Sequence, residues 1–193
     1  MVNETNPSTL NRPGWISALS RPLGNQVMLV VAPHAANPLM LELAARLAVE
    51  QPLRVLDGGN RFNVYPVAKA VRRRTAKLEE ALGRITLSRA FTCYQLQALL
   101  EESPNTPDPT LLLDMLNTFL DESVPLPESR RLLGKCLPHL RRLAGTAPLV
   151  VSAKPAPPIA QERQVLLDML QAAADQCWVL EPLPEVKRQM ELF

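Results

Sequence analysis

Residues 26–50 have the sequence QVMLVVAPHAANPLMLELAARLAVE, in which a short apolar run precedes a helix-like repeat. The run at 26–32 is rich in valine and stops at Pro33, as expected of a strand buried on both faces. Leucines at 39, 43 and 47 then recur at helical spacing. Pro38 suits the first turn of a helix, and Asn37 is placed to cap it. The stretch therefore predicts a buried strand followed by a helix.

The same alternation continues along the chain. Apolar or β-branched runs predict further strands at residues 54–57, 84–90, 110–114, 148–152 and 177–180. Helical patterns cover residues 64–82, 127–144 and 159–175, and the capping-box spacing of Thr92 and Gln95 starts another helix. We expect a doubly wound α/β domain, with a mainly parallel sheet of five to six strands and helices on both faces. It should span residues 23–181, between an N-terminal extension (1–22) and a C-terminal tail (182–193).

The composition fits one globular domain. The 193 residues are 47% hydrophobic and carry a formal net charge of +2, so nucleic acid would have to meet a local basic patch. Three cysteines at scattered positions suggest reduced thiols, and two histidines without a C-x-x-C pair give no support for a metal site. No apolar run approaches the roughly 20 residues that span a bilayer, and residues 1–13 lack the apolar core of a signal peptide. We expect a cytoplasmic protein without membrane contact.

The loop after the first predicted strand lies where P-loop proteins bind phosphate. Their G-x-x-x-x-G-K-S/T motif supplies glycine amides, a lysine and a magnesium-binding hydroxyl. When residues 32–39 are aligned with this motif, Ala32 and Asn37 stand in place of the two glycines. Pro38 stands in place of the lysine, and Leu39 stands in place of the Ser or Thr whose hydroxyl binds magnesium. The degenerate loop, made of Ala32, Pro33, Asn37, Pro38 and Leu39, predicts that neither ATP nor magnesium is a cofactor.

Three further segments resemble the core of the RecA/RadA recombinase and KaiC-like ATPase superfamily. They are VLDGGNRFNVYPVAKAVRRR (55–74), LGRITLSRAFTCYQLQALL (82–100) and TLLLDMLNTFLDE (110–122). In that family the second strand ends in Asp-x-Glu followed by a Phe, the third in an Arg-Ala-Phe turn, and the fourth in the Walker B Asp. The resemblance spans roughly residues 26–180.

The resemblance implies a RecA-like fold with an incomplete catalytic set. Asp57 and Phe62 match the family's Asp and Phe, Gly59 stands where the catalytic Glu belongs, and Asp114 matches the Walker B Asp. Such an ATPase needs its Lys, hydroxyl and Glu to bind phosphates, hold magnesium and activate water. We therefore expect a degenerate domain that does not hydrolyse ATP. Asp114 could equally be an acid that caps the end of a strand.

The last five residues, QMELF, closely resemble the bacterial sliding-clamp binding peptide. The resemblance implies that Gln189 offers amide hydrogen bonds, that Met190 fills a shallow apolar site, and that Leu192 and Phe193 fill a deep one. The alternative is an apolar C-terminus that folds back onto the domain.

Basic residues mark two candidate phosphate-contacting patches. Lys69, Arg73 and Lys77 fall at helical spacing, with Arg72 and Arg74 beside them, and are the candidate DNA contacts. Glu79 and Glu80 can pair with these bases, which favours an ordinary solvated face. A later helix carries a second group of bases, which could equally form an ordinary solvated face: Arg130, Arg131, Arg141 and Arg142. The loops that meet DNA in RecA-like proteins correspond to residues 121–127 and 153–158 and hold a single lysine, so direct DNA contact should be weak.

Three functions follow as hypotheses. The first is a non-catalytic accessory protein in DNA repair, translesion synthesis or replication, which docks a repair or polymerase-like partner and is tethered to the sliding clamp. The ImuA-type mutagenesis proteins and the SulA-like inhibitors, which are linked to the SOS response, are the nearest families by resemblance. The second is an ATP-binding RecA- or KaiC-like ATPase or sensor. The third is a SulA-like module that inhibits a cell-division or regulatory protein.

Overall fold

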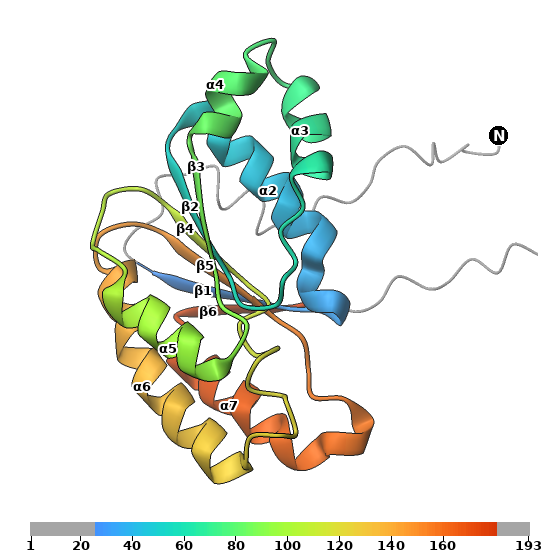
Figure 1. The fold of residues 1–193 in the computed structure, drawn as a ribbon, viewed down its shortest axis with the longest axis vertical. Coiled ribbons are helices and arrows are strands. Elements are labelled where there is room, and N and C mark those ends of the chain that lie inside the picture. The colour runs from blue at the N-terminus through green and yellow to red at the C-terminus, as the bar shows by residue number, and fades with distance from the viewer. Residues whose placement is uncertain (1–25, 181–193) are drawn as a thin grey trace, which may run out of the picture.

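The fold is known from a computed structural model, and residues 26–180 are described below. Six strands form one parallel sheet in the order β3-β2-β4-β5-β1-β6 (Figure 1). Their bounds are β1 (Val27–Val31), β2 (Leu53–Asp57), β3 (Ile85–Arg89), β4 (Thr110–Leu113), β5 (Leu149–Ala153) and β6 (Gln176–Val179). Every predicted strand is confirmed to within a residue or two at its ends.

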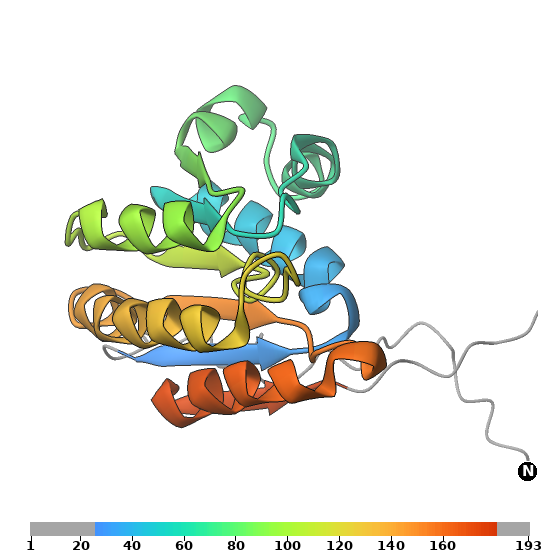
Figure 2. The same ribbon diagram turned by 60° about the horizontal axis from the view of Figure 1, so that its bottom comes forward.

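Helices cover both faces of the sheet, as Figure 2 shows. The helices are α2 (Asn37–Glu50), α3 (Val64–Arg72), α4 (Leu78–Gly83), α5 (Cys93–Glu102), α6 (Leu126–Ala144) and α7 (Gln164–Ala173), with 3-10 segments η1 (Pro33–Ala36) and η2 (Pro158–Arg163). Helices α2, α3 and α4 contribute to one hydrophobic cluster, and α5, α6 and α7 to the other. The predicted α/β class with a helix layer on each face is confirmed.

The strands divide their side chains between the two layers. In β1, Leu29 and Val31 pack toward the α5–α7 layer, whereas Met28 and Val30 pack toward the α2–α4 layer. Successive strand residues point to opposite faces, and every residue of β1 and β5 is buried. This explains why these strands appear in the sequence as unbroken apolar runs.

Two predicted helices are interrupted. The expected helix at 64–82 ends at Arg72, and α4 starts only at Leu78. Thr75 Oγ1 accepts a hydrogen bond from the amide of Lys77 (3.1 Å), a local turn that competes with the helix. The expected helix at 159–175 begins with the 3-10 segment η2, which follows a run of prolines, and becomes α-helical at Gln164.

None of the helices between residues 26 and 180 is both long and apolar enough to cross a membrane.

Candidate functional site

Because all six strands are parallel, the segments that follow them gather at one edge of the sheet, where α/β proteins bind their ligands. The first segment is η1, the predicted degenerate phosphate loop. His34, Ala35 and Ala36 all have φ of 52°, in the left-handed region. This conformation costs roughly 1–2 kcal/mol per residue that carries a Cβ. The loop is thus a tight left-handed turn built without glycine.

The backbone of this turn has few amides left for an anion. Pro33 and Pro38 have no N–H, and the amide of Ala35 donates to the carbonyl of Ala32 (3.0 Å). The amide of Asn37 donates to the carbonyl of His34. A phosphate-binding loop needs backbone N–H groups that point outward. Of the six residues 33–38, two are prolines without an N–H group, and two others use theirs in hydrogen bonds within the turn.

Asn37 does not cap α2, contrary to the prediction. Its backbone is already helical (φ −49°, ψ −47°), and the preceding Ala36 takes the capping position in a left-handed conformation. Helical geometry therefore starts one residue earlier than predicted, directly after the three left-handed residues. The Oδ1 atom of Asn37 is buried with no hydrogen-bond partner among the described residues.

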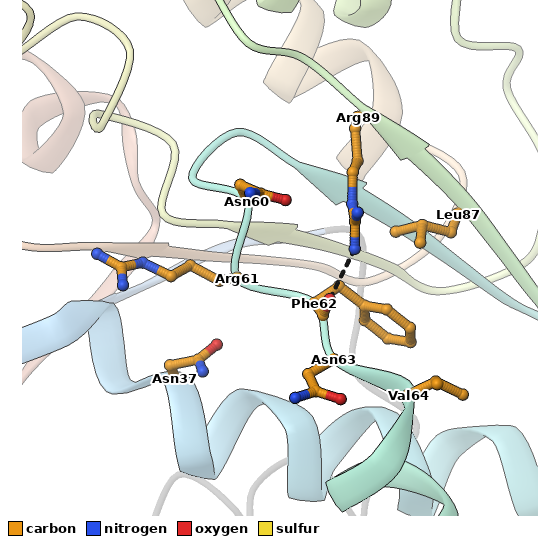
Figure 3. A pocket seen from close by; sticks show the side chains of 8 residues that line it. All are labelled: Asn37, Asn60, Arg61, Phe62, Asn63, Val64, Leu87 and Arg89. Atoms are coloured by element: carbon orange, nitrogen blue, oxygen red, sulfur yellow. Dashed lines mark hydrogen bonds between the residues drawn. The ribbon is translucent and has the colours of Figure 1, made fainter.

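Asp57 organises the turn after β2. Its buried carboxylate accepts hydrogen bonds from the amides of Arg61 (2.8 Å) and Phe62 (2.9 Å) and, more weakly, from that of Gly59 (3.3 Å). It also accepts from Nε of Arg89 at 3.2 Å, and Arg89 in turn donates to the Phe62 carbonyl (2.6 Å; Figure 3). The family-matching Asp57 therefore has a structural role in this chain, joining the ends of β2 and β3.

Asp114 lies one residue beyond β4 and is completely buried. Its Oδ2 accepts from Nε of Arg61 at 3.0 Å and lies 4.0 Å from Nζ of Lys154. Its amide donates to the Ser152 hydroxyl at the end of β5 (3.0 Å). Two cationic side chains of the protein, Arg61 and Lys154, therefore lie beside Oδ2 of this carboxylate. Its Oδ1 has no hydrogen-bond partner within residues 26–180.

Gly59 is in close contact with Asp114. A Cβ at position 59 would lie 2.5 Å from the Asp114 Cβ and 2.9 Å from its Oδ2. The position that carries the catalytic Glu in the resembled family therefore has no room for a side chain here. Sequence alone reveals the exchange of Glu for Gly but not this contact.

The residues present do not fit magnesium-bound ATP. A phosphate chain would meet Pro38 and Leu39 instead of a lysine and a hydroxyl. Oδ2 of Asp114, the matching metal-binding oxygen, is already engaged by Arg61. No group of three or more metal-ligating side chains occurs among the described residues.

A shallow pocket opens beside this network (Figure 3). Its rim carries polar side chains from the turn after β2 and the first residue of α2, and Phe62, Val64 and Leu87 supply apolar surface. The lining residues are Asn37, Asn60, Arg61, Phe62, Asn63, Val64, Leu87 and Arg89. The roles of Arg61 and Arg89 were not predicted, because no sequence pattern marks an arginine as the partner of a buried aspartate 53 or 32 residues away.

The predicted basic patch does not occupy one helix face, because α3 ends at Arg72. Arg73 and Arg74 both pair with Glu42 of α2, and Lys77 pairs with Glu80. Lys69 and Arg72 remain exposed, and neither has an ion pair within the described part of the chain. DNA contact by these residues stays a prediction.

Other candidate residues have different outcomes. The clamp-peptide residues Gln189, Met190, Leu192 and Phe193 lie outside the described residues. Lys154, the single lysine of the expected DNA loops, points inward and donates to Oδ1 of Asn117 (2.7 Å).

Two of the cysteines, Cys93 and Cys136, are buried. Burial raises the pKa of the Cys136 thiol to about 12, so this thiol is protonated at neutral pH.

No protein-family model matches the chain, and the comparison with curated proteins gives no significant match. The parallel α/β fold is consistent with a RecA-like domain but is not specific to one, so the likeness to RecA-type proteins rests on the residues named above.

Proposed function

We propose that the protein is a non-catalytic, RecA-like accessory protein in DNA repair, translesion synthesis or replication. In this proposal, its domain docks a repair or polymerase-like partner, and residues 189–193 tether it to the bacterial sliding clamp. Tethering raises the local concentration of the partner to about the millimolar range, so strong DNA contacts are not required.

The observation that carries the non-catalytic part is the engagement of Asp114 by Arg61. In a magnesium-dependent ATPase that carboxylate faces the metal, whereas here a guanidinium occupies one of its oxygens at 3.0 Å. The close approach of Gly59 and the loss of loop amides support the same conclusion.

The clamp tether is tested by calorimetric titration of the whole protein with purified bacterial sliding clamp. Burial of Leu192 and Phe193, combined with backbone contacts, should give a Kd of about 1 μM, which the double variant Leu192→Ala/Phe193→Ala should weaken at least about tenfold. The matched control, Lys187→Ala/Arg188→Ala, alters the same segment outside the motif and should bind normally. Equal affinity of all three proteins, or no binding by the unaltered one, contradicts the tether.

Two further measurements separate the alternative functions. A rise in the unfolding midpoint with magnesium and ATP that is lost in Asp114→Ala would favour the ATP-binding alternative. Protection of residues 189–193 from carboxypeptidase, together with no clamp binding, would favour the SulA-like interaction module.

A further inference from the structure

Helix α6 carries much of the positive charge of this nearly neutral protein. Its 19 residues hold five cations, Arg130, Arg131, Lys135, Arg141 and Arg142, against the single carboxylate of Glu128. The net charge of the whole chain is only +2. The helix lies between α5 and α7 in the outer layer, with one side facing solvent (Figure 2).

The exposed side of α6 has an ordered arrangement of these charges. Successive residues of a helix are about 100° apart, so Arg130 and Arg141 form one row along that side and Arg131 and Lys135 form a second row. Gly134 and Pro138, which have no long side chains, lie between the two rows. A Cβ on Gly134 would meet no atom within 4 Å. The exposed surface between the two rows of cations is therefore formed by residues with short side chains.

Two of these five cations, Arg131 and Arg141, are in ion pairs within the described residues. Arg130 and Lys135 have no ion pair there, and Arg141 lies 3.9 Å from Asp175. Arg131 pairs with Glu128, and Arg142 turns toward α5, where it donates to the Leu100 carbonyl (2.8 Å). On α3 and its flanking turn, three of the five cations are in ion pairs, all with glutamates.

The chemistry of the surface favours phosphate over an acidic protein. Protein interfaces are usually anchored by buried apolar or aromatic side chains, and none of the large exposed hydrophobic residues belongs to α6. Phosphate backbones need only spaced cations. Arg130 and Arg141 are 11 residues apart, which is about 16 Å along the helix, or roughly the rise of five nucleotides of one strand.

We propose that the exposed face of α6 binds the phosphate backbone of DNA. The proposal rests on the proposed function, since it supplies a DNA contact to a protein tethered at the clamp. It places that contact away from the loops at the carboxyl edge, where Lys154 is engaged by Asn117.

The test compares two double charge reversals that change the net charge equally. Binding of a duplex of about 20 base pairs at low salt is measured by fluorescence anisotropy, with the whole protein. Arg130→Glu/Lys135→Glu should weaken binding at least about tenfold and reduce the salt dependence. The comparison variant, Lys69→Glu/Arg72→Glu, reverses two exposed cations of the other candidate DNA patch, and if α6 makes the contact it should change the affinity less than about twofold.

Four outcomes would overturn the proposal. Equal weakening by both variants indicates a response to overall charge, and weakening by the α3 variant alone places the contact there. No binding by the unaltered protein removes the DNA contact. Poly-glutamate that competes for the same residues as tightly as DNA indicates an acidic protein partner. Clamp binding is measured on the same proteins, so a failure of this inference leaves the tether intact and is distinguishable from a failure of the proposed function.

Discussion

At the scale of single residues, Gly59 packs so closely against Asp114 that no side chain fits there. We expect Gly59→Ala to destabilise the fold by about 1–3 kcal/mol, because the new Cβ would overlap the side chain of Asp114. Urea denaturation measures the change.

The control for this substitution is Gly134→Ala on the exposed side of α6. A Cβ there meets nothing within 4 Å, so the better helix propensity of alanine should stabilise the protein by up to about 1 kcal/mol. If both variants changed stability in the same direction, the close packing inferred at Gly59 would be wrong.

At the scale of elements, a buried arginine joins segments that are distant in sequence. Arg163, at the end of η2, donates to the carbonyls of Phe119 (2.8 Å) and Val124 (2.6 Å) and to the hydroxyl of Ser129 (3.3 Å). It is 4% exposed, and no carboxylate is hydrogen-bonded to it among the described residues. It therefore holds the long connection between β4 and α6 against the start of α7.

We expect Arg163→Met to destabilise the protein by about 2–4 kcal/mol, because methionine keeps much of the volume but leaves two carbonyls without their donor. Amide hydrogen exchange should accelerate most in residues 117–125. The exposed Arg130→Met is the control and should stay within about 0.5 kcal/mol of the unaltered protein. A loss of stability without faster exchange in that connection would contradict the role given to Arg163.

At the scale of the whole molecule, the two hydrophobic clusters share the strands of one sheet. Leu140 of α6 belongs to one cluster and Met40 of α2 to the other, and both are fully buried. Because β1, β2, β4 and β5 contribute residues to both clusters, the two layers should unfold together.

We expect Leu140→Ala and Met40→Ala each to lower stability by about 2–5 kcal/mol in one cooperative transition. Trp178 packs against the Met40 cluster, so in a Trp15→Phe background its fluorescence reports on that face alone. Its midpoint should coincide with the far-UV circular dichroism midpoint in both variants. Separate midpoints in Leu140→Ala would mean that the layers unfold independently.

The sequence by itself determined the fold class and the order of the elements. Buried parallel strands produce apolar runs such as VMLVV at 27–31, and local patterns also mark helix starts. Thr92 caps α5 as predicted, accepting from the Gln95 amide at 3.1 Å. These signals depend on neighbours within a few residues, so they can be read without knowing the tertiary structure.

Only the tertiary structure decided what the site residues do. The sequence marks Asp57, Gly59 and Asp114 as matches to or departures from a motif. Their partners Arg89, Arg61 and Lys154 come from β3, the turn after β2 and the loop after β5, 32 to 53 residues away. Likewise, Glu42 of α2 is what neutralises Arg73 and Arg74. The physical reason is that burial and ion pairing are set by segments that meet in space, whereas local sequence records only the preferences of each segment.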